Sequence, residues 1–143
     1  RQHGEMFTQL DHVGIAVPDL DEAIAYYEKN FDMTAYHVEV NEEQGVREAM
    51  LRVGDSESSI QLLAPLSPES TIAKFIDRSG PGIQQMAYRV DDIDEVCATL
   101  RDRGLRLLYE APKNGTAGSR VNFIHPKDAG GVLVELVEPG QGH

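Results

Sequence analysis

The stretch His12-Val-Gly-Ile-Ala-Val-Pro-Asp-Leu-Asp-Glu22 decides the fold, because the chain carries a second copy of it. The copy begins 73 residues later and reads Gln85-Met-Ala-Tyr-Arg-Val-Asp-Asp-Ile-Asp-Glu95. A second match follows at an offset of 74, where Ile60-Gln-Leu-Leu-Ala-Pro65 lies over Val134-Glu-Leu-Val-Glu-Pro139. Both halves begin and end alike, so the chain contains two copies of one ancestral module.

The first half predicts one helix and four strands. The apolar run 10–17 ends at Pro18, which is typical of a strand, and Asp19 or Asp21 can then cap a helix. The apolar positions of that helix recur at intervals of three and four residues: Leu20, Ala23, Ile24, Tyr27 and Phe31. Further strands are expected at 34–40, 46–53 and 58–66.

The second half repeats this series, with a strand at 83–90 and a helix at 93–103 that Gly104 would end. Its remaining strands are expected at 105–109, 119–125 and 131–137. The predicted fold class is therefore α+β, with two tandem βαβββ modules.

We expect one domain over residues 10–139. Between the modules, Ile72, Phe75 and Ile76 are three and four positions apart, which predicts a short linker helix. The glycine-rich loop 113–118 lacks a phosphate-binding pattern and is either a hairpin connection or a mobile active-site flap. The predicted boundaries are module 1 about 10–66, linker helix 67–80, module 2 about 83–139, N-terminal tail 1–9 and C-terminal tail 140–143.

Composition limits the partners that the protein can have. The 143 residues carry a formal net charge of -11, which disfavours nucleic acid because phosphate binding relies on clustered Lys and Arg. No apolar run approaches the roughly 18 residues of a membrane span, and the start of the chain does not resemble a secretory signal. We therefore expect a cytoplasmic protein with no nucleic-acid or membrane partner. The single cysteine, Cys97, excludes an intrachain disulfide.

Four polar residues interrupt apolar strands at matched places. The repeat pairs His12 with Gln85, and it pairs Gln61 with Glu135. Taken singly, a polar strand residue is more often a hydrogen-bonded or partly exposed side chain. Four such residues at symmetric positions are harder to explain by chance, so we predict that they bind one divalent cation. The alternative is a buried symmetric hydrogen-bond network.

The donor set favours a catalytic ion over a structural one. One imidazole, two amide oxygens and one carboxylate contain no thiolate, which argues against structural zinc. Cobalt, manganese, magnesium and nickel would all fit these donors. An octahedral ion would keep two positions for water or substrate, as a Lewis-acid catalyst requires.

The paired modules, with candidate ligands on the first and last strand of each, resemble the vicinal-oxygen-chelate superfamily. This superfamily includes glyoxalase I, extradiol dioxygenases and bleomycin-binding proteins. Within it, the chain is most similar to the methylmalonyl-CoA epimerases, in the segments Asp11-His-Val-Gly-Ile-Ala-Val17, Glu43-Gln-Gly-Val-Arg-Glu48, Ser70-Thr-Ile-Ala-Lys-Phe-Ile76, Val90-Asp-Asp-Ile-Asp94 and Asn122-Phe-Ile-His-Pro-Lys127. One departure is Gly82-Ile-Gln-Gln85, where those epimerases commonly read Gly-Ile-His-His, so an amide replaces an imidazole among the ligands.

The resemblance implies an enzyme that interconverts the C2 epimers of methylmalonyl-CoA, removing and returning a proton through an enolate. It nominates Glu48 as one acid-base group; Glu135 is the second candidate, either as a base or as a ligand only. Asn122, which the repeat aligns with Glu48, is predicted to bind the substrate. Arg120 and Lys127 are predicted to contact the CoA phosphates or the substrate carboxylate, or else are ordinary solvated charges. The resemblance also implies that the two modules form a curved mixed sheet around the metal site, with cobalt as the preferred ion and zinc as a further candidate. It implies a homodimer as well.

Two other functions stay open. A glyoxalase I-type enzyme acting on a thiol hemithioacetal would typically have Glu where Gln61 stands, which favours the epimerase. A non-catalytic ligand-binding protein of the same fold would not need an intact set of metal ligands. An extradiol dioxygenase is disfavoured, because Gln85 removes one histidine from the two-histidine, one-carboxylate iron site.

Overall fold

The computed structural model describes residues 4–140, which divide into two compact units. The first unit is His12–Gln84. The second unit combines the start of the chain, up to Asp11, with Gln85 and the residues that follow it. The expected tail residues 1–3 and 141–143 lie outside the described residues. No helix within 4–140 is long and apolar enough to cross a membrane.

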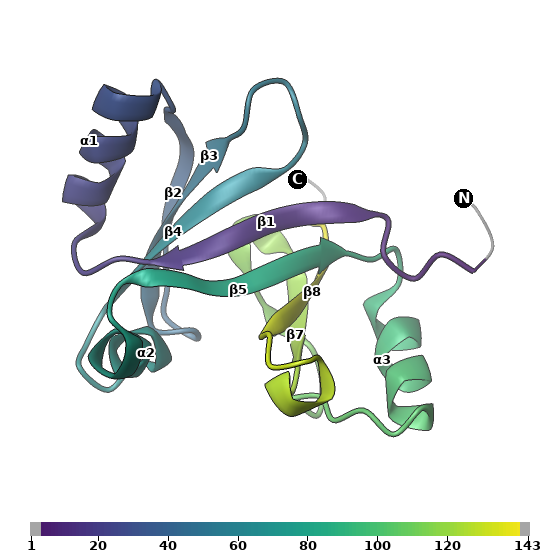
Figure 1. The fold of residues 1–143 in the computed structure, drawn as a ribbon. Helices are drawn as coiled ribbons and strands as arrows, with labels where there is room; N and C mark the ends of the chain where they lie inside the picture. Colours follow the sequence, from purple (N-terminus) through teal and green to yellow (C-terminus); the bar gives the residue numbers. More distant parts are fainter. Residues whose placement is uncertain (1–3, 141–143) are drawn as a thin grey trace. The chain divides into compact units, whose positions relative to one another are not determined.

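The first unit contains the βαβββ module and the linker helix that the sequence predicts. Its strands lie in the order β2, β3, β4, β1, in which β1 runs parallel to β4 and the other neighbours are antiparallel (Figure 1). The elements are β1 (Gln9–Ala16), of which residues 12–16 lie in this unit, α1 (Leu20–Phe31), β2 (Ala35–Asn41), β3 (Val46–Arg52), β4 (Ser59–Pro65) and α2 (Thr71–Ser79).

Helix α1 begins and ends where short polar residues satisfy its backbone. The Asp19 carboxylate accepts from the Glu22 N–H at 3.0 Å, which satisfies one of the donors that the first turn leaves without a partner. The helix stops at Asp32, which adopts the left-handed conformation with a φ of 56°. The predicted Asp19 cap is therefore confirmed.

Alternation along the strands gives the sheet of the first unit two different faces. One face packs on α1, with Leu20 buried against Leu62 and their neighbours. The opposite face carries Glu48 and Gln61, and we call it the Glu48 face. Helix α2 covers part of the Glu48 face, because Ile72 is buried there together with Leu63.

The second unit repeats the arrangement, with strand order β5, β8, β7, β6 and a parallel pairing of β5 with β8. Helix α3 packs on β7 and β8, and the face of the sheet away from α3 carries Glu135, with Ala87 and Val137 beside it. We call this second surface the Glu135 face. The elements are β5 (Gly82–Arg89), α3 (Ile93–Asp102), β6 (Lys113–Asn114), β7 (Arg120–Ile124) and β8 (Val134–Glu138), with single 3-10 turns at Thr116–Gly118 and Pro126–Asp128.

One predicted strand of the second unit is wrong. Segment 105–109 makes only an isolated bridge between Leu107 and Ile124, and the short edge strand is β6 instead. The reason is that side chains replace part of the ladder. The Tyr109 N–H donates to the Asn122 side chain, and the Arg106 N–H donates to the Asp128 carboxylate.

The predicted N-terminal tail is also wrong for residues 6–9. Met6 and Phe7 pack against the α3 core, and the Phe7 ring stacks on Tyr88 with a centroid separation of 4.5 Å. The Thr8 N–H then donates to the Arg89 carbonyl at 2.9 Å, and β1 begins at Gln9. These four residues were not predicted to pack because the segment is too short to show a periodic apolar pattern.

Candidate active site

Glu48 and Gln61 form a buried polar pair on the Glu48 face. In the antiparallel pairing of β3 with β4, Gln61 lies opposite Met50, and Glu48 is two residues before Met50, so both polar side chains project from the same face. Their exposures are 2% for Glu48 and 3% for Gln61. The Gln61 amide donates from Nε2 to Oε1 of Glu48. The carboxylate is therefore held on β3 by the neighbouring strand.

His12 shares this face with the pair. In the parallel pairing of β1 with β4, His12 lies opposite Ser59, which is two residues before Gln61. His12 is buried, with 3% of its surface exposed. The first unit therefore places three of the predicted functional residues on one side of one sheet: His12, Glu48 and Gln61.

The second unit brings Gln85 and Glu135 together. Strand β5 runs beside β8, where Ala87 lies opposite Glu135, and Gln85 is two residues before Ala87. The Gln85 amide donates from Nε2 to Oε1 of Glu135 at 2.8 Å, and both side chains are buried. In each unit, therefore, a glutamine amide donates to a buried carboxylate.

The donor atoms fit a divalent cation. Because Nε2 of each glutamine donates to a carboxylate, Oε1 is the amide atom that remains suited to a cation. Within 4–140 there is no cluster of three or more His, Cys, Asp or Glu residues with metal-binding geometry. The predicted set contains only two such residues, His12 and Glu135, and takes its other two donors from amides. It also draws on both units, so the four ligands stay a prediction.

The structure corrects the repeat alignment of Asn122. Glu48 lies opposite Leu63 in the first unit. In the second unit Val137, the repeat counterpart of Leu63, lies opposite Val121. Val121 is therefore the counterpart of Glu48, and the alignment of Glu48 with Asn122 is wrong by one residue. A slip of one residue along a strand moves a side chain to the other face of the sheet.

Asn122 performs a structural task on the α3 side of the sheet. Its side chain accepts from the Tyr109 N–H at 3.1 Å and donates to the Tyr109 carbonyl at 3.0 Å, and it also donates to Sγ of Cys97 at 3.6 Å. None of its surface is exposed. The predicted contact of Asn122 with substrate is therefore withdrawn. Burial raises the pKa of the Cys97 thiol, against the smaller opposing effect of the Asn122 bond.

The two basic side chains that were predicted to bind phosphate, Arg120 and Lys127, differ in their surroundings. Arg120 is paired with Asp94 at 3.0 Å and lies 3.7 Å from Glu138, beside the first turn of α3. The hydrogen bond to Arg120 lowers the pKa of Asp94. A phosphate would have to compete with these carboxylates for the Arg120 guanidinium, and the contact of Arg120 with phosphate stays a prediction. Lys127 is exposed in the turn Pro126–Asp128 and stays a candidate.

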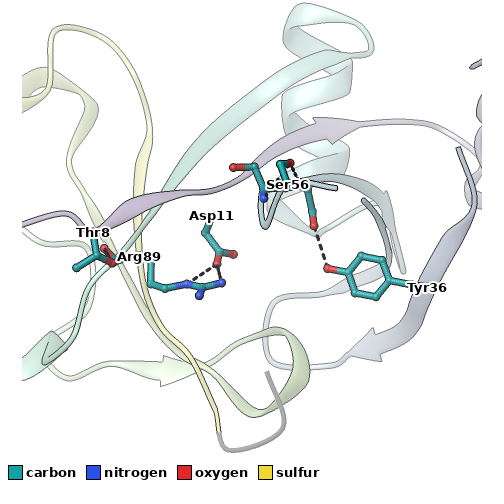
Figure 2. A network of polar contacts seen from close by, with 7 residues as sticks. Thr8, Asp11, Tyr36, Ser56 and Arg89 are labelled. Carbon is teal, nitrogen blue, oxygen red and sulfur yellow. Dashed lines mark hydrogen bonds and ion pairs between the residues drawn. The ribbon is translucent and has the colours of Figure 1, made fainter. Parts of the chain in front are cut away.

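Two polar pairs were not predicted from the sequence. On β2, His37 contacts Glu39 at 2.5 Å, and Glu39 lies directly opposite Glu48 in the strand pairing. In the second unit, Arg89 binds the buried Asp11 carboxylate, as Figure 2 shows. One signal was visible in the sequence for the second pair, because Asp11 is a charged residue inside an apolar run.

Comparison with known proteins identifies the family. The model of the Glyoxalase/Bleomycin resistance protein/Dioxygenase superfamily matches residues 11–123. The crystal structure of methylmalonyl-CoA epimerase from Mycobacterium tuberculosis is 56% identical, with a TM-score of 0.95 over 99% of this chain and 95% of that one. A Streptomyces coelicolor methylmalonyl-CoA epimerase variant in complex with 2-nitronate-propionyl-CoA is 43% identical, with a TM-score of 0.90 over 94% of this chain and 99% of that one.

A human relative carries the same name as these two structures. The mitochondrial methylmalonyl-CoA epimerase of Homo sapiens is 37% identical over 129 residues, which are 90% of this chain and 72% of the human protein. The α+β fold class that the repeat predicts and the glyoxalase-like arrangement that the resemblance implies are thereby confirmed. On the matching family model and these likenesses, which each cover at least 90% of this chain, the chain belongs to the Glyoxalase/Bleomycin resistance protein/Dioxygenase superfamily.

Proposed function

We propose that this protein is an epimerase that interconverts the two C2 epimers of methylmalonyl-CoA. The observation that carries the proposal is the buried Glu48 carboxylate, which the Gln61 amide orients on the Glu48 face. The likeness to methylmalonyl-CoA epimerases over nearly the whole chain supports the choice of substrate.

The reaction requires a base at C2 and stabilisation of the charge that results. A glutamate of ordinary pKa, about 4.3, is a weak base for a carbon acid, so the negative charge of the enolate must be offset. In the proposal His12, Gln61, Gln85 and Glu135 hold one divalent cation. When bound, that ion would supply the positive charge that offsets the enolate.

The chain's own carboxylates move the proton. Glu48 takes the C2 proton and becomes a neutral acid, and the electron pair of the C–H bond passes into the thioester enolate. A proton delivered to the opposite side of C2 completes the inversion. Glu135 is our candidate donor, because on the Glu135 face of the second unit it is the only carboxyl group of β5, β7 and β8. A carboxylate that binds the ion carries no proton to give, so Glu135 acts either as this acid or as a ligand only.

Several finer points belong to the same proposal. We take the ion to be cobalt, which elemental analysis of protein purified without added metal would check. Lys127 is proposed to contact the CoA phosphates, since it is exposed and cationic. We also propose a homodimer that works in the cytoplasm, which sedimentation analysis and cell fractionation would test.

Deuterium exchange tests the function directly. The purified protein is incubated in D2O with a single epimer of methylmalonyl-CoA, and the appearance of the other epimer and of deuterium at C2 is followed by NMR. We expect both signals with the untreated protein, loss of both after removal of metal by a chelator, and recovery when a divalent cation is restored.

A parallel assay separates the rival functions. The same protein is offered a thiol hemithioacetal, and its isomerisation is measured at the same enzyme concentration. Hemithioacetal turnover without C2 exchange would replace the epimerase with a glyoxalase I-type enzyme. Binding of the CoA thioester with no turnover of either compound would instead indicate a ligand-binding protein.

A further inference from the structure

Arg89 holds the start of β1 at two points. Its guanidinium donates to Oδ1 of Asp11 twice, from Nε at 3.1 Å and from Nη2 at 2.8 Å (Figure 2). Its backbone carbonyl accepts from the Thr8 N–H at 2.9 Å and from the Thr8 hydroxyl at 3.3 Å. All three residues belong to the second unit. One arginine thus holds both the residue before β1 and a residue within it.

The Asp11–Arg89 pair is unusual among the ion pairs of the second unit because its acid is buried. The Asp11 side chain is 3% exposed, whereas the carboxylates of the Arg106–Asp128 and Arg120–Asp94 pairs are 22% and 64% exposed. Removing two charges from water costs about as much as their attraction returns, so a buried pair is a weak source of stability. The main effect of this pair is to orient the Asp11 side chain, because the two hydrogen bonds from Arg89 fix where its carboxylate lies.

The residue that follows Asp11 is His12. Both lie inside β1, with no loop between them to absorb a displacement. A shift of the Asp11 backbone is therefore passed directly to His12, whose imidazole must lie within a few tenths of an ångström of its ideal distance to bind a metal ion. Groups behind the ligands commonly set metal affinity in this way.

We propose that Arg89 is a positioning residue for His12: by holding Asp11 and Thr8, it fixes the backbone of β1 and aims the His12 imidazole at a divalent cation. This inference rests on the proposed function, since it requires that His12 binds the ion. Arg89 itself touches neither substrate nor metal in this role.

Metal titration of the apo-protein tests the inference without relying on activity. Mn2+ binding is measured by calorimetry for the unaltered protein and for Arg89→Met, Arg89→Lys, His12→Ala and Arg106→Met. We expect Arg89→Met to weaken Mn2+ about tenfold or more. Arg89→Lys, which keeps the charge and one donor, should recover part of the loss. Arg106→Met is the matched control, because it breaks an exposed pair in the same unit.

Hydrogen exchange distinguishes positioning from general stability. In Arg89→Met we expect faster amide exchange in the peptide that covers β1, with unchanged exchange in α3 and β7, below the melting temperature. If Arg89→Met is too unstable to purify, the double variant Asp11→Leu/Arg89→Met replaces both charges with apolar groups and restores stability. That variant should fold and still bind Mn2+ about tenfold more weakly.

The possible failures can be told apart. If the unaltered protein does not bind Mn2+, or His12→Ala binds it equally well, the proposed metal site is wrong, and with it this inference. If His12→Ala loses binding while Arg89→Met or the double variant binds Mn2+ as tightly as the unaltered protein, the metal site stands and the positioning role of Arg89 is wrong.

Discussion

The Gln61 amide donates from Nε2 to Oε1 of Glu48, across the antiparallel strands β4 and β3, and both side chains are almost entirely buried. A carboxylate with few torsions left free presents one orientation to a substrate, which lowers the entropy cost of reaching the reactive geometry. The counterpart of Glu48 in the second unit is Val121. The repeat is therefore asymmetric at the position where proton transfer is proposed.

Replacing Glu48 by Gln should abolish its proton transfer while keeping the shape of the side chain. We expect C2 deuterium exchange from at least one epimer of methylmalonyl-CoA to fall about a hundredfold or more, with metal content unchanged. The control is Glu39→Gln, which removes the carboxylate directly opposite Glu48 and should keep most of the activity. Unchanged exchange from both epimers in Glu48→Gln would remove Glu48 from the mechanism.

Gln85→His should change the metal preference. The Gln85 amide now donates to Glu135 at 2.8 Å, and an imidazole there could donate from one nitrogen and ligate with the other. Imidazole favours Co2+ over Mg2+, so we expect the ratio of Co2+ to Mg2+ affinity to rise roughly tenfold. Competition calorimetry measures this ratio. An unchanged ratio would argue against Gln85 as a ligand.

Asn122→Ala should destabilise the protein without weakening substrate binding. Its loss removes hydrogen bonds to both backbone groups of Tyr109, although the Tyr109 carbonyl keeps the bond from Arg101 at 2.8 Å, so the free energy of unfolding should fall by about 2 kcal/mol. Urea unfolding measures this change. Asn114→Ala, at an exposed position on β6, should cost no more than about 0.5 kcal/mol. A raised KM with normal stability in Asn122→Ala would restore the substrate role that the structure withdraws.

The Arg106–Asp128 pair should stabilise the fold only above acidic pH. Hydrogen bonds from Arg106 hold the pKa of Asp128 at about 2, below the ordinary 3.8. Because the pKa is lower in the folded state, the stabilisation is complete above about pH 4 and is lost as the pH falls towards about 2. In urea unfolding at neutral pH, Asp128→Asn should therefore have a lower free energy of unfolding than the unaltered protein, and this difference should shrink in acid. A difference that stays constant through this range would contradict the prediction.

Cys97 should be inert in the folded protein. Its thiol is buried and its pKa is raised by burial, so little thiolate forms at neutral pH. A disulfide reagent such as DTNB should react slowly under native conditions and quickly in denaturant. In Asn122→Ala, which removes the polar neighbour of the sulfur, native reaction should become faster only as far as unfolding becomes more frequent.

The elements with strong local signals were predictable from the sequence. Asp19 and Asp92 cap their helices where the repeat places them, and Gly104 follows α3 with a positive φ of 88°. The matched positions of Gln61 and Glu135 on β4 and β8 also follow from the repeat. Each of these features depends on residues close together in the chain or on direct comparison of the two copies.

Features that depend on strand register were not predictable. The two copies align at an offset of 73 in their first strands and 74 in their last, and the position of the change decides which face Asn122 occupies. An alignment error of one residue at this point assigns the Asn122 side chain to the Glu135 face, whereas it lies on the face that packs against α3. The strand predicted at 105–109 was wrong for a related reason. The Asn122 and Asp128 side chains there accept backbone N–H groups that a neighbouring strand would otherwise pair with.

The packing of Phe7 and Thr8 also sets an order of events during synthesis. Thr8 and Arg89 are 81 positions apart, so the ribosome makes the start of β1 long before the strand that holds it. Until Tyr88 and Arg89 emerge, Phe7 lacks the ring on which it stacks and Asp11 lacks the guanidinium that binds it. Long-range contacts of this kind are slow to form. These contacts of the N-terminal residues can therefore form only after β5 has been made.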